Sequence, residues 1–355
     1  MEISITNFKS IGKAQVKLGR ATVLLGPPAA GKSNLLETIA FATYFDRYAF
    51  YDDVEPLPRL VRTDNIRCVF TQCNTSKLVE IGIGADGRRR TLRLRLFQNW
   101  PRLELNHAEV PIKEGNNASY LFSYSGRLYQ AHISGVKDMI RGLEEKVLAR
   151  LYGFDRFKDS IVNSMVSGVE VEAPSLLRED GKNFGAAAAG HVEVFKNINA
   201  ELKELSQTEI VLLDDGRVAA HHGHIAMRPP ESLLRVLYYL VGLSSTYDYA
   251  RLHGLEDKAV VLLEDPEVYP KFFHLLVEYI AKFSEVGYVV ITTHSPILVS
   301  LLRDKLDITP YYVYRGDGGL TEVAELDKDK LAEELATSED VLFMKPSEVL
   351  HFVKR

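Results

Sequence analysis

The sequence predicts an α/β protein with a mixed core sheet flanked by helices, an antiparallel β lobe and a helical lobe. Three patterns in the chain support this fold class. A buried strand followed by a helix occurs near each end, within residues 20–45 and 258–296. Short alternating strands follow the first of these units, and helical periodicity dominates residues 136–206.

The first elements in chain order are strands and one helix. Residues 2–8 alternate apolar and polar side chains, which is typical of a half-buried strand, and residues 20–26 form an apolar run typical of a fully buried one. Residues 34–45 carry apolar side chains at helical spacing. Short antiparallel strands are then predicted at residues 66–73, 77–84 and 91–97, the last two joined by a hairpin turn at residues 85–87.

The second half contains most of the predicted helices. We expect helices at residues 136–154 and 191–206, a hairpin at 209–227, a buried helix at 231–243, a strand at 258–265, an amphipathic helix at 271–283, a buried strand at 287–294 and a closing hairpin at 311–326. No long heptad run interrupts this order, so we expect no inserted coiled-coil arm.

The composition is that of a soluble globular protein. The 355 residues are 46% hydrophobic and 26% charged, and the net charge of −5 excludes a protein that coats DNA through an overall basic surface. Two cysteines, Cys68 and Cys73, are too few for a disulfide framework, and the sequence has no apolar run long enough to span a membrane. The N-terminus lacks the pattern of a secretion signal, so we expect a cytoplasmic protein.

The segment LLGPPAAGKSN, residues 24–34, has the spacing of a phosphate-binding loop (Walker A) between a buried strand and a helix. Such a loop surrounds phosphates with backbone N–H groups at a helix N-terminus. Lys32 would neutralise phosphate charge, and Ser33 would bind Mg²⁺. The residues expected to contact the nucleotide here are Gly26, Ala29, Ala30, Gly31, Lys32, Ser33 and Asn34.

Two prolines lie inside this loop. Pro27 and Pro28 lack N–H donors, but the donors of such a loop come mainly from its later half, residues 29–33, which keep theirs. We therefore expect the prolines to stiffen the entry of the loop without removing its ability to bind ATP.

Two further strands end in residues that suit nucleotide hydrolysis. The strand VVLLEDPE ends in Glu264 and Asp265, where one carboxylate could hold Mg²⁺ through water and the other could act as a general base. The strand VVITTHSP ends in His294, which we expect to approach the γ-phosphate.

The segments ITNFKSIG, TVLLGPPAAGKSNLLE, VVLLEDPE and VVITTHSP occur in that order along the chain. Together they resemble the ABC-type head of P-loop ATPases of the SMC, RecF and OLD branch, above all small predicted AAA-family, RecF-like ATPases that are little more than a head. LLREDGKNF at residues 176–184 also resembles a segment of those proteins. The resemblance implies one composite ATPase domain over residues 1–355, made of a phosphate-loop and antiparallel β lobe (1–135), a helical, signature-bearing lobe (136–250) and the rest of the core (251–355).

The resemblance also implies further site residues. Lys9 and Ser10 of NFKS would lie near the nucleotide, and a glutamine would sense Mg²⁺. Gln130 is the candidate for that glutamine, with Gln72 as its rival. The Mg²⁺ ligands implied in this way are Ser33, Glu264 and Gln130.

The chain departs from the family pattern in two places. Arg228, Pro229 and Pro230 stand where the family has a Ser-Gly-Gly signature that meets the γ-phosphate of a partner subunit. Arg228 could replace those donors in trans as an arginine finger, or could simply cap a solvated turn. The acidic pair is Glu-Asp instead of the usual Asp-Glu, so the expected general base, Asp265, is one methylene shorter and hydrolysis is expected to be slow.

These observations predict a switch protein that binds and hydrolyses ATP with Mg²⁺ as a head-to-tail homodimer enclosing two ATP molecules. DNA or a protein partner, such as a nuclease or a repair factor, would couple the switch to DNA repair, chromosome maintenance or defence against mobile DNA. A nucleotide-binding scaffold with little turnover and an ATPase subunit that controls a separate nuclease remain alternatives. The arginines between residues 88 and 95 form a basic stripe, for which a solvated face is favoured over a nucleic-acid contact.

Overall fold

A computed structural model describes residues 1–50, 56–85, 88–114, 122–124, 127–141, 146–168 and 176–328, together with Val349 and Val353. The chain divides into two compact units. The first unit contains Met1–Ala149 and Thr309–Arg355, and the second contains Arg150–Ile308. The turn predicted at residues 85–87 and the segment after residue 328 fall largely outside the described residues.

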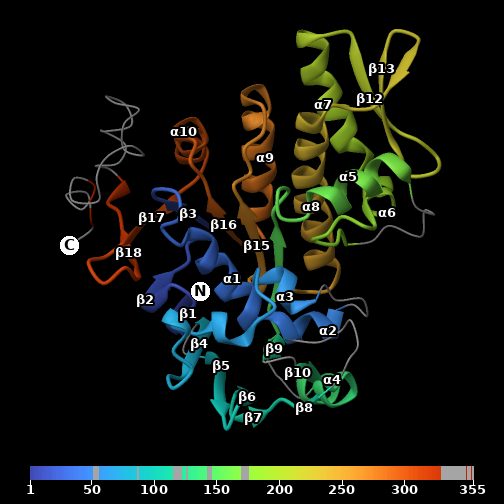
Figure 1. The fold of residues 1–355 in the computed structure, drawn as a ribbon. Helices are drawn as coiled ribbons and strands as arrows, with labels where there is room; N and C mark the ends of the chain where they lie inside the picture. The colour runs from blue at the N-terminus through green and yellow to red at the C-terminus, as the bar shows by residue number, and fades with distance from the viewer. Residues whose placement is uncertain are drawn as a thin grey trace. The chain divides into compact units, whose positions relative to one another are not determined.

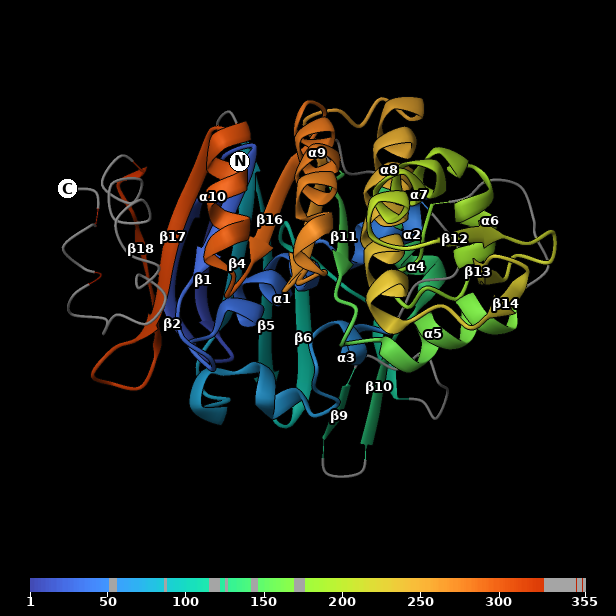
Figure 2. The ribbon, with the colours of Figure 1, turned by 90° about the horizontal axis from the view of Figure 1, so that it is seen from above.

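The first unit is built around an antiparallel arrangement of strands with helix α1 against it (Figures 1 and 2). Its strands follow the order β3-β17-β18-β2-β1-β4-β5-β6-β7, in which β18 runs parallel to β2. The strands are β1 (Glu2–Phe8), β2 (Ile11–Lys17), β3 (Ala21–Leu25), β4 (Val79–Ala85), β5 (Arg88–Phe97), β6 (Trp100–Leu105), β7 (Ala108–Glu109), β17 (Ile308–Arg315) and β18 (Thr321–Glu325).

A smaller sheet and short helices complete the first unit. The small sheet has the order β8-β10-β9, formed by β8 (Ile112–Glu114), β10 (Arg127–Ala131) and β9 (Phe122–Tyr124). The helices are α1 (Lys32–Ala42), α2 (Arg47–Phe50), α3 (Leu57–Leu60) and α4 (Ile133–Arg141), with 3₁₀ turns η1 (Tyr44–Asp46), η2 (Ile66–Val69) and η3 (Thr71–Cys73). Strand β3 is buried at every position, as its apolar run predicts.

The second unit contains three neighbouring strands of the large sheet, in the order β11-β15-β16, together with long helices. Its strands are β11 (Leu148–Tyr152), β15 (Ala259–Glu264) and β16 (Tyr288–Thr292), and a separate sheet contains β12 (Thr208–Leu212), β13 (Val218–His222) and β14 (Ile225–Met227). The helices are α5 (Lys158–Ser167), α6 (Phe184–Ala189), α7 (Val192–Leu205), α8 (Glu231–Leu252), α9 (Phe273–Ser284) and α10 (Pro296–Lys305), with a 3₁₀ turn η4 (Pro270–Phe272).

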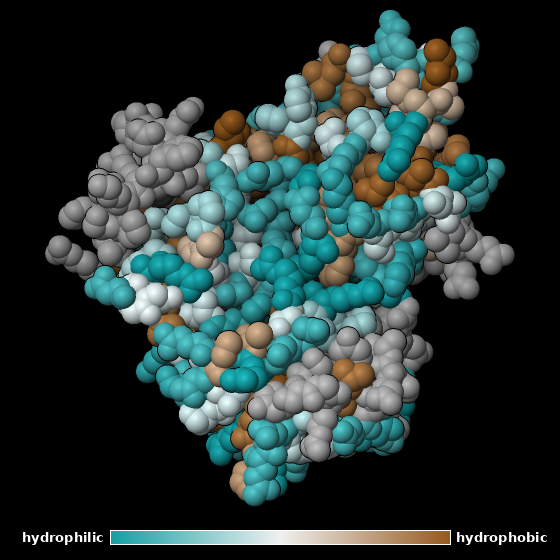
Figure 3. All heavy atoms as spheres, viewed as in Figure 1, coloured by the Kyte–Doolittle hydropathy of each residue, from teal (hydrophilic) through white to brown (hydrophobic). Residues whose placement is uncertain are grey.

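Helix α8 is the apolar helix that the sequence predicts, and it is longer than predicted. It contacts both α9 and strand β15, and α8 and α9 lie side by side in Figures 1 and 2. Its middle, from Val236 to Thr246, is buried, which matches an apolar surface on all sides. Hydrophobic residues also reach the surface over α7, β12 and β13 (Figure 3).

Two of the predicted elements are wrong. Residues 66–73 form the turns η2 and η3 instead of a strand. The Asn65 side chain accepts the Arg67 N–H at 3.0 Å and starts a turn, and Ile66, Val69 and Phe70 are buried at helical spacing. Gln72 has a φ of 55°, which an extended strand does not allow.

The predicted helix at residues 136–154 is also wrong in its second half. Helix α4 ends at Arg141, and residues 148–152 form strand β11. All five residues of β11 are buried, Arg150 among them. An isolated segment of this composition favours a helix, but burial of all five residues decides for a strand, which lies next to β15 at the end of the strand order.

Candidate functional site

The predicted phosphate loop connects β3 to α1 in the first unit. Gly26 and Gly31 have φ values of 144° and 109°, which L side chains rarely adopt. A Cβ atom on Gly26 would lie 2.0 Å from the Val313 carbonyl oxygen, and one on Gly31 would lie 2.2 Å from the Thr321 hydroxyl. Both glycines of the motif are therefore required by backbone conformation and by packing.

Lys32 turns back onto its own loop. Its side chain is almost fully buried, and Nζ donates to the carbonyl oxygens of Gly26 at 2.9 Å and Pro27 at 3.1 Å. The Pro27 carbonyl also accepts the Ala30 N–H at 3.3 Å, and Ala29 adopts a φ of 60°. The Pro27 carbonyl oxygen thus helps to shape this loop. The N–H groups of the first turn of α1 have no partner within the helix and can bind a ligand. This cradle, with a buried cation at a helix N-terminus, fits a phosphate chain.

A network of hydroxyl and amide groups supports the loop from the side. The Asn34 amide donates to the Ser10 hydroxyl at 2.6 Å, and Ser10 Oγ lies 2.7 Å from Thr321 Oγ1. The Thr321 hydroxyl donates to the Ala30 carbonyl at 2.8 Å, and Arg315 Nε donates to the Ala29 carbonyl at 3.0 Å. The structure therefore brings Ser10 and Asn34 together. Sequence reasoning missed Thr321, because a single threonine almost 300 residues away carries no local signal.

Lys9 lies in an ion pair with a helix residue. Its ammonium group is 2.5 Å from Glu37 Oε2 on α1 and donates to the Val61 carbonyl at 2.6 Å. Glu37 is fully buried and also binds Arg62 at 2.6 Å. This contact anchors the end of β1 to α1, and a direct contact of Lys9 with nucleotide stays a prediction.

The two candidate glutamines differ in their surroundings. Gln130 lies on β10 and is buried, and its Oε1 atom has no hydrogen-bond partner among the described residues. Gln72 is exposed, in the turn η3. A buried acceptor without a hydrogen-bond partner lowers the stability of the fold by about 1–3 kcal/mol. Binding of a metal ion to such an atom would offset that cost. Burial and the missing partner of Oε1 favour Gln130 over Gln72, and a contact of either with Mg²⁺ stays a prediction.

In the second unit, strands β15 and β16 run parallel, with Glu264 in register with Thr292. Their carboxyl ends therefore lie at one edge of the sheet, and this edge carries both Asp265 and His294. Glu264 is buried, and its Oε2 accepts from Arg156 Nε at 2.8 Å and Nη2 at 2.7 Å. Sequence reasoning missed Arg156, which follows β11 in the chain.

Asp265 has a strained backbone, with a φ of 40°. Its N–H donates to the Thr292 hydroxyl at 3.0 Å, and its Oδ1 is buried with no hydrogen-bond partner among the described residues. His294 is exposed, and its N–H donates to Glu267 Oε1 at 3.4 Å. Ser295 then caps α10 by accepting the Leu298 N–H at 3.3 Å. This edge thus carries the Asp265 carboxylate, whose backbone N–H is bonded to Thr292, and the exposed imidazole of His294.

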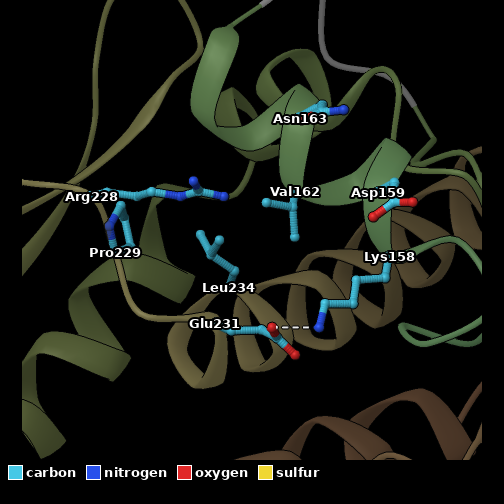
Figure 4. A pocket seen from close by; sticks show the side chains of 8 residues that line it. All are labelled: Lys158, Asp159, Val162, Asn163, Arg228, Pro229, Glu231 and Leu234. Atoms are coloured by element: carbon cyan, nitrogen blue, oxygen red, sulfur yellow. Dashed lines mark ion pairs between the residues drawn. The ribbon is translucent and has the colours of Figure 1, made fainter.

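The altered signature lies beside a pocket of about 380 Å³ within the second unit. Figure 4 shows Arg228 extending toward Val162 and Asn163 on α5, opposite the ion pair of Lys158 and Glu231, whose charged atoms are 2.6 Å apart. The hydrogen bond from Lys158 holds the pKa of Glu231 below its ordinary value. Arg228 is exposed and forms no ion pair with any described residue.

The basic stripe on β5 is divided by its pairing. Arg90 is buried and binds Asp46, whereas Arg93 binds Glu80 at 2.6 Å. The Arg89 side chain contacts the Ser4 hydroxyl. The stripe is therefore not one continuous cationic surface.

A family model described as "AAA domain, putative AbiEii toxin, Type IV TA system" matches residues 21–300. The chain belongs to this family. The matched range contains the phosphate loop, the acidic pair and His294. A search of curated proteins finds no match to the chain.

Solved structures share the fold at low sequence identity. One is the SmcHead bound to the C-winged helix domain of ScpA, with a TM-score of 0.53, 14% identity and coverage of 94% of this chain and 99% of that chain. Another is the Smc head domain with an extended coiled coil bound to the C-terminal domain of ScpA derived from Pyrococcus furiosus, with a TM-score of 0.52, 12% identity and coverage of 95% and 98%.

The predicted fold class is therefore confirmed: the chain has the ABC-type ATPase head fold of the SMC branch, in which a mixed sheet is flanked by helices. It carries an AAA-type nucleotide-binding domain. Within the described ranges, no helix is both long and apolar enough to cross a membrane.

Proposed function

We propose that this chain is an ATP-binding and ATP-hydrolysing switch protein. The observation that carries the proposal is the loop between β3 and α1, where two glycines in left-handed conformation, a buried Lys32 and a helix N-terminus form a phosphate cradle. A structural turn would not need a buried lysine held by loop carbonyls. ATP would compete with those carbonyls for the ammonium group of Lys32.

The residues of each motif have a proposed role in this chemistry. In the first unit, Lys32 would neutralise phosphate charge, and Ser33 and Gln130 would be ligands of Mg²⁺. In the second unit, Glu264 would hold the metal through water, and Asp265 would take a proton from the attacking water. His294 would contact the γ-phosphate. Bound Mg²⁺ would supply charge neutralisation on the phosphates.

The proposal includes a head-to-tail homodimer that forms when ATP binds. Arg228 supports it, because its guanidinium group is exposed and has no ion pair among the described residues. An exposed arginine beside the start of a buried helix could reach the γ-phosphate of a second copy. Coupling to DNA repair, chromosome maintenance or defence against mobile DNA, through DNA or a partner such as a nuclease, is the proposed use of the switch.

A scaffold with little turnover is the second candidate. It is favoured by the Glu-Asp order of the acidic pair and by the altered signature at Arg228, Pro229 and Pro230. This reading predicts tight ATP binding with almost no hydrolysis.

Asp265→Asn separates the two candidates. We expect wild type and variant to bind ATP equally, and wild type to hydrolyse it at least tenfold faster, since a positioned base contributes about 10²–10⁴-fold. Asp215→Asn is the matched control, because Asp215 is an exposed aspartate of the same unit paired with Arg217. Equal rates in wild type and Asp265→Asn, with both binding ATP, would refute the switch and support the scaffold.

Mass measurement with and without ATP and Mg²⁺ tests the dimer. The Asp265→Asn protein, which should retain bound ATP, is expected to double in mass when both are present. Arg228→Ala is expected to remain monomeric under the same conditions. A monomer under every condition would contradict the dimer mechanism.

A further inference from the structure

Arg156 binds one oxygen of Glu264 with two of its donors. Nε and Nη2 both converge on Oε2, at 2.8 Å and 2.7 Å. The guanidinium group is 2% exposed and the glutamate is 9% exposed, so the contact is shielded from water. The usual two-oxygen, fork-like contact between arginine and carboxylate does not form here. Both donors therefore contact Oε2, and Oε1, which is also buried, takes no part in this contact.

The surroundings of Glu264 are shaped for this one arrangement. A Cβ atom at Gly153, directly after β11, would lie 2.9 Å from Glu264 Oε2, so the carboxylate lies close to the backbone there. The Tyr239 hydroxyl donates to the Glu264 carbonyl oxygen at 2.9 Å. Backbone and side chain of Glu264 are thus both fixed.

A glutamate at this strand end needs such fixing more than an aspartate would. Its side chain has one additional rotatable bond, and each freely rotating side-chain bond lowers the precision with which a carboxylate can meet a ligand. Asp265, next in the chain, is already held through its N–H by Thr292. Arg156 restrains the longer side chain of Glu264 by binding its Oε2 atom.

We propose that Arg156 is a positioning residue that fixes the Glu264 carboxylate, so that Oε1 is the oxygen presented to a hydrated Mg²⁺. The inference rests on the proposed function, because it concerns the metal that accompanies ATP. It assigns a role in this site to a residue outside the four sequence motifs. It also explains how this chain accommodates glutamate as the first acid of the pair.

The test measures how strongly Mg²⁺ tightens binding of a fluorescent ATP analogue, in parallel with the hydrolysis rate. In Arg156→Gln, we expect a rise of about tenfold in the Mg²⁺ concentration that gives half of the maximal tightening of analogue binding. Other residues that orient metal ligands have effects of this size. Arg156→Lys should recover part of the loss, since it keeps the charge but offers no planar pair of donors.

A double-mutant cycle shows whether Arg156 acts through Glu264. Glu264→Asp shortens the side chain, so the carboxylate no longer reaches Arg156. In that background, Arg156→Gln should change the Mg²⁺ dependence less than about twofold, because the coupled contact is already absent. Equal effects of Arg156→Gln in both backgrounds would overturn the proposal.

Arg150 provides a matched control in the same unit. It is 2% exposed and binds the buried Glu179 at 2.5 Å, so Arg150→Lys perturbs a comparable ion pair. It should lower the unfolding temperature without changing the Mg²⁺ dependence. If Arg156→Lys and Arg150→Lys behave alike, Arg156 is merely structural and the inference fails. If wild type binds ATP with no response to Mg²⁺, the metal part of the proposed function fails first, which is a distinct outcome.

Discussion

Thr321→Val tests whether a hydroxyl from β18 holds the phosphate loop in shape. Thr321 is 1% exposed, donates to the Ala30 carbonyl at 2.8 Å and lies 2.7 Å from Ser10 Oγ. Valine keeps the shape of the side chain and removes both hydrogen bonds. The change should therefore loosen the loop without creating a cavity.

The structure sets the size of the effect. Two hydrogen bonds contribute about 1 kcal/mol each, so we expect a loss of about 2 kcal/mol in the free energy of unfolding. For a chain of this length that corresponds to a fall of about 3 °C in the unfolding temperature. If binding of ATP has to restore half of this free energy, about 1 kcal/mol, to order the loop, the Kd for ATP rises about fivefold.

Thr71→Val is the matched control. Thr71 is also buried in the first unit and also donates to a backbone carbonyl, that of Ile11 at 2.9 Å, but it does not contact the loop. Calorimetric titration with ATP and thermal unfolding should show that both variants lose stability, while only Thr321→Val loses affinity. Equal ATP affinities in the two variants would refute the role assigned to Thr321.

Three further predictions follow from single contacts. Gly31→Ala should weaken ATP binding at least tenfold in a titration, because the position has a φ of 109° and no room for a Cβ atom, whereas Gly318→Ala, where nothing lies within 4 Å, should bind normally. Lys9→Met should lower the free energy of unfolding by about 3 kcal/mol in a denaturant titration, because it removes one partner of the buried Glu37, and an unchanged midpoint would contradict the burial of that charge. The hydrogen bond from Arg235 holds the pKa of Asp155 below its ordinary 3.8, so the stabilisation is present above that value and should be lost as the pH falls through the lowered pKa. The Asp155 side chain is 66% exposed, so the free energy of unfolding of wild type should exceed that of Asp155→Asn by less than about 1 kcal/mol at pH 7. A difference that does not shrink as the pH is lowered would contradict the assignment.

Much of the fold follows from local sequence patterns. The buried run of β3, the helical spacing of α1, the parallel pair β15 and β16 and the hairpin of β17 and β18 are as predicted. Each signal is contained within a few consecutive residues, where hydrophobic periodicity and turn residues act directly. The strand, loop and helix around Lys32 were predicted from the same kind of local signal.

The two wrong predictions have different causes. Strand β11 has a composition that favours a helix, and its burial at all five positions, which neighbouring residues do not reveal, makes it a strand. The turns at residues 66–73 have an apolar pattern that also fits alternation, and the Asn65 side chain together with the left-handed Gln72 decides against a strand. The Asn65 hydrogen bond is a local signal that the periodicity outweighed in the prediction.

The sequence by itself determined which residues we propose to carry the chemistry: the phosphate loop, the acids Glu264 and Asp265, and His294 at a strand end. Only the tertiary structure decided how they are held, through Thr321 at the loop and Arg156 at Glu264. The reason is physical. Chemistry requires particular side chains at fixed spacing along one strand or helix, whereas support comes from whichever residue the fold brings within hydrogen-bond distance, at any separation in the chain.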